Sequence, residues 1–399
     1  MSLDNQRRAP MRPKWMSKGV LQISFSAFFA DVGYQTVQAI FPIYLVLTLS
    51  SNAFYFGLAN AIAFGGGALF AYCAGLLGNR YSRKWLAVLG SAFILLMPLV
   101  GLTVNPIIAI TLFATGWWAR NFRIPPRRSM LADMSRKENM GKVFGFLHAL
   151  DIGGGMISVA ILLAFLAIGT GQHTILIITA IPLAISVFLL LITKDVRRRQ
   201  GGMPIKNEES ANTRIGKSAY RGIIIATALY GFSYYSLGFP ILTIAKSSNI
   251  LLGVGSYGVY LGVSALIGYF IGSRKRLNKI KALGYLGYML SGIGTAVLAV
   301  GYATGSGFGV YYLGVALMGF GLGVVETMEP TIISLMRSIV RVDTGMGALQ
   351  GSRSFGLFFA NLIMGLLYLV SPSYSYLYAA IVSLAAGALV LIAGRSFKA

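Results

Sequence analysis

The sequence predicts an all-α polytopic membrane protein with twelve transmembrane helices arranged as two six-helix bundles. Of its 399 residues, 56% are hydrophobic and only 11% are charged, and the mean hydropathy is +0.71. Soluble domains average about 45–50% apolar residues. Apolar runs of about 20 residues, the length that a helix needs to cross a bilayer, recur along the whole chain. The cations gather on alternate connections between these runs.

The apolar runs define the predicted helices in order. They do not alternate polar and apolar residues in segments of about ten, as the strands of a transmembrane β-barrel would. We expect helices close to residues 19–48, 53–78, 85–103, 106–122, 143–168, 173–193, 222–245, 250–272, 282–302, 308–335, 345–370 and 374–394.

The distribution of charge predicts the orientation. All of the 34 Lys and Arg residues except Lys246 fall on alternate connections and on the two termini. Such asymmetry is the positive-inside rule, so we expect a multi-pass protein of the cell membrane with both termini in the cytoplasm. We expect the basic loops to meet anionic lipids of the inner leaflet. The formal charge of +23 is thereby explained without nucleic-acid binding, which we do not expect.

The chain divides into two similar halves. We predict an N-terminal bundle at 1–193, a cytoplasmic linker at 194–221, rich in charged and small polar residues, and a C-terminal bundle at 222–399. Matching positions support an internal duplication, a common plan in secondary transporters. Pro126, Leu131 and Gly141 recur at one common offset as Pro330, Leu335 and Gly345, and the Phe-Pro at 41–42 recurs at 239–240.

The loop between the second and third predicted helices carries a motif. Its sequence, GLLGNRYSRK from Gly75 to Lys84, resembles the signature loop of the major facilitator superfamily, Gly-x-Leu-Ala-Asp-Arg-x-Gly-Arg-Lys. The stretch from Arg120 to Asp151 resembles a bacterial and archaeal branch of that superfamily with an Arg-x-x-Pro-Arg loop element, here Arg123, Pro126 and Arg127.

The resemblance implies a cytoplasmic latch that holds the inner gate shut. In the family the loop Asp contacts the start of the eleventh helix and nearby arginines, but here that position is Asn79. We expect the gating residues to be Gly75, Asn79, Arg80, Arg83, Lys84, Arg123, Pro126 and Arg127.

The first predicted helix carries a polar face. Asp31, Gln35 and Gln38 follow one another at helical spacing, and Asp31 lies near the middle of the bilayer. A charge there is costly unless it faces a cavity or a partner. The face is either a substrate or proton site or a buried helix–helix hydrogen bond.

Other intramembrane charges are few. Asp151 shares one face of the fifth helix with His148, and its role is either functional or structural. Glu326 and Glu329 share one face of the tenth helix, at a depth similar to that of Arg353 in the eleventh. We predict an intramembrane Glu–Arg pair, which acts either as a gate or as a structural link. The fourth helix also departs from the family pattern. Phe113 stands where many proton-coupled members of the family carry an Arg.

These residues predict a secondary active transporter of a small solute, coupled to protons and working by alternating access. The acids within the predicted membrane helices favour a cationic or polar solute, because Arg353 is the one cation expected in the core. An uncoupled facilitator or a membrane sensor or lipid-handling protein without transport remains an alternative. We expect a monomer without cofactor, no enzyme activity and no metal site, since two His and one Cys are too few and too dispersed.

Overall fold

The computed structural model describes residues 16–78, 80–135, 140–195, 213–233, 237–274, 277–335 and 342–394. In these ranges the ordered elements are all helical. The first group comprises α1 (Lys18–Ile43), η1 (Tyr44–Thr48), α2 (Ala53–Leu77), α3 (Arg83–Ile94), η2 (Pro98–Leu102), α4 (Pro106–Asp133), α5 (Met140–Ala167), α6 (Gln172–Ile178) and α7 (Ala180–Leu191).

The second group follows the connection at 194–212. Its elements are α8 (Thr213–Ser233), α9 (Gly238–Ser247), α10 (Ile250–Ser273), α11 (Lys279–Lys281), η4 (Ala282–Met289), α12 (Leu290–Ala303), α13 (Phe308–Leu335), α14 (Val342–Val370) and α15 (Pro372–Ala393).

Polar caps explain where several of these helices begin. The side chains of Ser17, Asn52, Asn105 and Asn249 each accept a hydrogen bond from a backbone N–H in the first turn of α1, α2, α4 and α10. Such caps satisfy donors that the helix itself leaves unpaired. The helix starts are therefore encoded locally.

Ten helical segments among the described residues are long and apolar enough to cross a membrane. Short elements join to form some of them: α3 continues into η2, α6 into α7, and α11 through η4 into α12. Two long helices remain. α1, with 26 residues, carries the polar face of Asp31, and α4, with 28, carries several arginines in its second half. Counting them, the predicted twelve-helix fold is confirmed.

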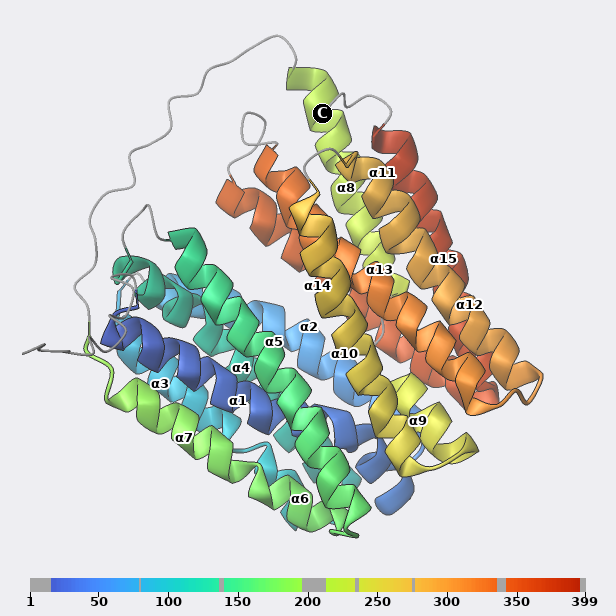
Figure 1. Ribbon diagram of the computed structural model, residues 1–399, viewed down its shortest axis with the longest axis horizontal. Coiled ribbons are helices and arrows are strands. Elements are labelled where there is room, and N and C mark those ends of the chain that lie inside the picture. Colours follow the sequence, from blue (N-terminus) through green and yellow to red (C-terminus); the bar gives the residue numbers. More distant parts are fainter. Residues whose placement is uncertain are drawn as a thin grey trace, which may run out of the picture.

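The helices form two groups in space (Figure 1), with α1–α7 in blue to green and α8–α15 in yellow-green to red. The groups are similar in plan: α4 and α13 both have 28 residues and both contain a proline near the end, at Pro126 and Pro330. The two Phe-Pro elements are linked through one side chain, because the ring of Phe56 contacts both Phe41 and Phe239.

One end of the molecule carries most of the described basic residues near helix ends, among them Lys18, Arg80, Arg83 and Arg274; we call it the basic end. At the opposite end the two groups pack closely. A Cβ atom on Gly57 of α2 would lie 2.4 Å from the carbonyl oxygen of Asn361 in α14. From this contact the groups spread apart toward the upper left of Figure 1, where α1 and α8 begin far from each other.

Two predicted boundaries are wrong. The linker was expected to run to residue 221 and the seventh helix to begin at 222, but α8 already begins at Thr213. We expected the fourth helix to end near residue 122 and placed Arg123, Pro126 and Arg127 in a loop, but α4 continues to Asp133. The prolines and cations suggested a loop, yet neighbouring helices can supply hydrogen bonds that a proline removes from a membrane helix. Arg123 and Arg127 are buried instead, with 2% and 3% of their surface exposed.

Candidate functional site

Asp31 lies on α1 in the interior of the first group. Only 2% of its surface is exposed, and its carboxylate interacts electrostatically with Asp151 of α5 and with Arg120 and Arg123 of α4. Its Oδ1 atom has no hydrogen-bond partner among the described residues. The structure thus brings together two acids that the sequence singled out separately.

Three arginines share one face of α4, at Arg120, Arg123 and Arg127, because their spacing of three and four residues returns to the same side of a helix. The Arg120 guanidinium lies over the rings of Tyr34 and Trp117, at 4.9 and 4.8 Å from their centroids. These arginines are the main finding that the sequence did not predict as part of the core.

Two glycines let the helices approach closely at this cluster. A Cβ atom on Gly90 of α3 would lie 2.8 Å from the Cβ of Arg123, and one on Gly154 of α5 would lie 2.9 Å from the Cβ of Asp31. Both distances are too short for real carbon atoms. Gly90 therefore lets α3 approach α4 at Arg123, and Gly154 lets α5 approach α1 at Asp31.

The charges in the cluster are only partly paired. Arg127 Nη2 lies 3.7 Å from Asp151 Oδ2, and 26% of the Asp151 side chain is exposed. Buried guanidinium nitrogens remain without a partner in the described part of the chain: Nε of Arg120, and Nε and Nη1 of both Arg123 and Arg127. We call Asp31, Arg120, Arg123, Arg127 and Asp151 the α1–α4–α5 cluster.

The polar face of α1 continues toward the opposite end. Gln35 Oε1 accepts a hydrogen bond of 2.6 Å from the hydroxyl of Tyr257 in α10, so this bond joins the two helix groups. Gln38, one turn further on, is half-buried. The face of Asp31 and Gln35 therefore lies at the junction of the two groups.

The second group holds its own charged set. Arg353 of α14 pairs with both Glu326 and Glu329 of α13, which confirms the predicted Glu–Arg pair. Glu329 is fully buried and also accepts hydrogen bonds from Tyr288 and Thr227. All these residues belong to one group, so the pair links helices within it and does not itself bridge the two groups.

Glu326 differs from Glu329 in its surroundings. Its side chain is 54% exposed, and it interacts electrostatically with Arg128 of α4, across the space between the two groups. Arg128 is itself exposed. Opposite charges on α4 and α13 thus face each other where the groups are apart.

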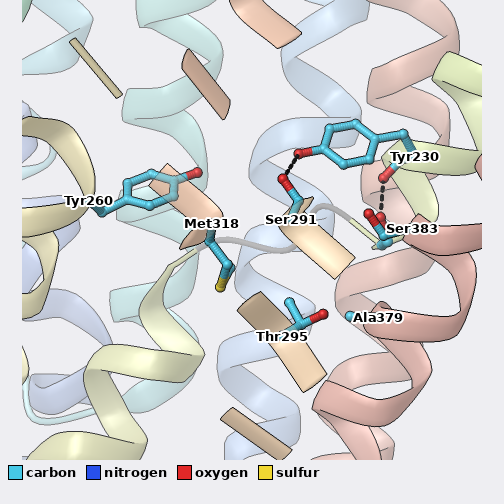
Figure 2. Close-up of a pocket in the computed structure, with 8 residues that line it drawn as sticks. Tyr230, Tyr260, Ser291, Thr295, Met318, Ala379 and Ser383 are labelled. Carbon is cyan, nitrogen blue, oxygen red and sulfur yellow. Dashed lines mark hydrogen bonds between the residues drawn. The ribbon is translucent and has the colours of Figure 1, made fainter. Parts of the chain in front are cut away.

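A small cavity with hydroxyl groups lies inside the second group (Figure 2). Its volume is about 10 Å³, room for one water molecule, and the Tyr230 hydroxyl lies 3.1 Å from Ser291 Oγ at its wall. Thr295 and Ser383 add further hydroxyl groups to the lining. The cavity is too small for an organic solute.

A larger, apolar cavity of about 380 Å³ lies beside α1, α5, α6 and α7. Phe28, Val32, Ile161 and Phe165 are among its lining residues. It lies on the side of α1 away from the arginines of α4, and its walls carry no charged side chain. The charged cluster and this cavity are therefore distinct environments on two sides of α1.

The predicted gating residues divide into two sets. Arg80 lies at the basic end just before α3, Lys84 lies in the first turn of α3, and Arg83 pairs with Asp133 at the end of α4. Gly75 has open space around it. Asn79 lies outside the described residues. The other predicted gating residues, Arg123, Pro126 and Arg127, lie within α4 as described above.

The expectation for an Arg in the fourth helix also changes. Phe113 is an apolar core residue stacked on Phe41 at 3.9 Å between centroids. Arg120, two turns further along α4, is the first of the three arginines of that helix that interact with Asp31 or Asp151. The regular spacing of Arg120, Arg123 and Arg127 was the signal that could have placed them on one helical face, had the prolines not suggested a loop.

Comparison with known proteins places this geometry in a family. The sequence profile of the Major Facilitator Superfamily matches residues 23–340. An uncharacterised MFS-type transporter of Methanocaldococcus jannaschii is 22% identical over 396 residues, which cover 94% of this chain and 95% of the relative.

Solved structures agree on the fold. A bacterial homologue of the human lysosomal transporter Spinster, inward-facing and unoccupied, matches with a TM-score of 0.73 at 14% identity, over 97% of this chain and 98% of that one. The POT family transporter PepTSo matches with 0.75 at 11% identity, over 96% and 99%. A D-xylose–proton symporter matches with 0.72 at 14% identity, over 94% and 96%. The chain therefore belongs to the major facilitator superfamily of membrane transport proteins.

Proposed function

We propose that the protein is a secondary active transporter of a small solute, coupled to protons and working by alternating access in the cell membrane. The observation that carries the proposal is the α1–α4–α5 cluster, which gathers ionisable side chains inside a membrane protein. Intramembrane charges are costly and mark substrate or proton paths in transport proteins. The basic end faces the cytoplasm in this proposal, because the positive-inside rule favours it.

The arrangement of the two helix groups supports alternating access. They are joined at the opposite end through Gly57 with Asn361 and through Gln35 with Tyr257, and they spread apart toward the basic end. This corresponds to an inward-open state. Rocking of one group against the other around the cluster would close the basic end and open the opposite one.

Proton coupling is assigned to Asp31, with Asp151 as its partner. The two acids interact with each other and with the same arginines. A proton gained by one carboxylate therefore reduces the negative charge beside these arginines. A solute that binds in the cluster senses this change. Each charge moved through 100 mV corresponds to about 2.3 kcal/mol, enough to drive accumulation or export.

The test is solute flux in proteoliposomes under an imposed pH gradient, with the parent protein, Asp31→Asn and the matched control Asp195→Asn. Asp195 lies outside the cluster and accepts a hydrogen bond from Ser82. We expect the gradient to drive flux of the solute identified by screening in the parent and the control. Flux in Asp31→Asn should lose its dependence on the gradient.

Three outcomes would contradict the proposal. If the gradient drives flux equally in Asp31→Asn and the parent, Asp31 does not couple protons, and gradient-independent flux in all three proteins would indicate a facilitator. If no solute crosses and labelling shows that Gln35 and Gln38 never meet water, a sensor or lipid-handling role replaces transport.

A further inference from the structure

The composition of the α1–α4–α5 cluster carries an inference about the chemical class of the solute. The cluster contains three guanidinium groups, of Arg120, Arg123 and Arg127, but only two carboxylates, of Asp31 and Asp151. Arg remains protonated in proteins. The cluster is therefore net positive even when both acids are ionised.

The hydrogen-bond donors of these arginines are also in excess. Arg123 and Arg127 are 2% and 3% exposed, yet Nε and Nη1 of each have no partner among the described residues. A buried charged donor without an acceptor is costly. Two guanidinium groups one helical turn apart provide the planar donor pattern that suits carboxylate and phosphate oxygens.

The cluster is accessible from the basic end. Asp151, which lies 3.7 Å from Arg127, exposes 26% of its side chain, and the neighbouring Arg128 is exposed. The buried arginines thus lie directly beneath the partly exposed Asp151 and the exposed Arg128. The Arg120 guanidinium lies over the rings of Tyr34 and Trp117, and this contact leaves its Nε atom without a hydrogen-bond acceptor among the described residues.

We propose that Arg123 and Arg127, assisted by Arg120, bind an oxyanion group of the transported solute, a carboxylate or a phosphate. The inference rests on the proposed transport function and names its substrate class. It replaces the sequence-based expectation of a cationic or polar solute, which depended on Arg353 being the one cation in the core.

The test measures binding directly, on purified protein in detergent, so that it does not depend on transport. The probes are succinate, glycerol 3-phosphate and phosphatidylglycerol, each with an uncharged counterpart: succinamide, glycerol and diacylglycerol. Ligands that bind the folded state raise the melting temperature. Intrinsic tryptophan fluorescence, to which Trp117 beside Arg120 contributes, gives a second readout.

We expect at least one oxyanion probe to raise the melting temperature of the parent, while its uncharged counterpart does not. Arg127→Gln should weaken that binding by about tenfold or more, the loss typical of one charged hydrogen-bonded contact. Arg123→Lys, which keeps the charge but loses the planar donor pair, should weaken it less. The control Arg274→Gln, on the exposed end of α10, should bind like the parent.

The probe that binds identifies the source of the oxyanion as a soluble dicarboxylate, a phosphate ester or a lipid headgroup. Equal shifts with charged and uncharged probes, unchanged binding in a folded Arg127→Gln, or no shift with any oxyanion up to about 10 mM would overturn the inference. Binding without flux in proteoliposomes would leave this site standing and reject the transport proposal. Flux of an uncharged solute that is the same in Arg127→Gln and the parent would support the transport proposal and reject the oxyanion site.

Discussion

Glu329 shows how a charged residue becomes part of a membrane-protein core. It is fully buried, and Arg353, Tyr288 and Thr227 contact its two carboxylate oxygens. This complete set of partners offsets the cost of burying the charge. Glu326, one turn away, is paired with the same Arg353 but keeps 54% of its side chain exposed. The two acids therefore differ in what they contribute to stability.

We predict that Glu329→Gln lowers the free energy of unfolding by about 3 kcal/mol, because it leaves a buried guanidinium with one acceptor fewer. Glu326→Gln should lower it by less than about 1 kcal/mol, as expected for an exposed ion pair. Denaturation of both variants in the same detergent micelles measures the difference. Equal losses would mean that Glu329 is not the structural member of the pair.

At the residue scale, the acids of the site could be predicted from the sequence and the arginines could not. Asp31 stands alone in an apolar run, so its cost in the membrane is visible without a structure. Arg123 and Arg127 stand among prolines and other cations, where a loop explains them equally well. The packing of neighbouring helices, as at Gly90 and Arg123, is what shows that this region is buried.

At the scale of elements, α2 and α14 form a close backbone contact between the two groups. The Cα atom of Gly365 would lie 2.9 Å from a Cβ added to Gly57, so the two backbones touch without side chains between them. Small residues permit this kind of approach between membrane helices. A larger residue at Gly57 is incompatible with closure of the opposite end.

We predict that Gly57→Val opens that end and shifts the protein toward an outward-open state. Spin labels at Val104→Cys and Phe308→Cys, both exposed at the opposite end, in a Cys73→Ser background, should report a longer distance than in the parent. Gly351→Ala on α14 fills open space and should leave the distance unchanged. A distance in Gly57→Val equal to that of the parent would contradict the prediction.

The helices themselves were largely predictable, because apolar length and polar caps are local properties. Ten segments satisfy length and apolarity by themselves, and Asn52, Asn105 and Asn249 mark helix starts in the sequence. The extent of α4 was not predictable from local signals. Its last turns contain Pro125 and Pro126, and their helical conformation depends on the helices around them.

At the scale of the whole molecule, the loop at the basic end is fastened within the first group through Arg83 and Asp133. The latch implied by the family resemblance would add a contact to the second group when the basic end closes. Asn79 can accept a hydrogen bond from a helix terminus but lacks the favourable charge of an Asp. The closed state of the basic end is thus less favoured than it would be with an acid there.

We predict that Asn79→Asp shifts the population toward closure of the basic end. A charge at a helix N-terminus contributes about 0.3–1 kcal/mol, so the ratio of closed to open molecules should rise about two- to fivefold. Spin labels at Tyr81→Cys and Tyr269→Cys, exposed at that end in the first and second group, measure it as a larger short-distance fraction. No change, or a change toward longer distances, would leave the loop as a topology signal alone.

The two long helices that fall short of the apolarity of the other spans, α1 and α4, have a consequence for how the protein is made. Each Arg placed at the centre of an isolated membrane helix costs about 2.5–3.5 kcal/mol on insertion, and α4 carries three on one face. Lipid alone is therefore a poor environment for α4 during synthesis. We expect the translocon to release α4 only in company with α1, whose Asp31 supplies the opposite charge, so that the future solute site assembles as the first half of the chain enters the membrane.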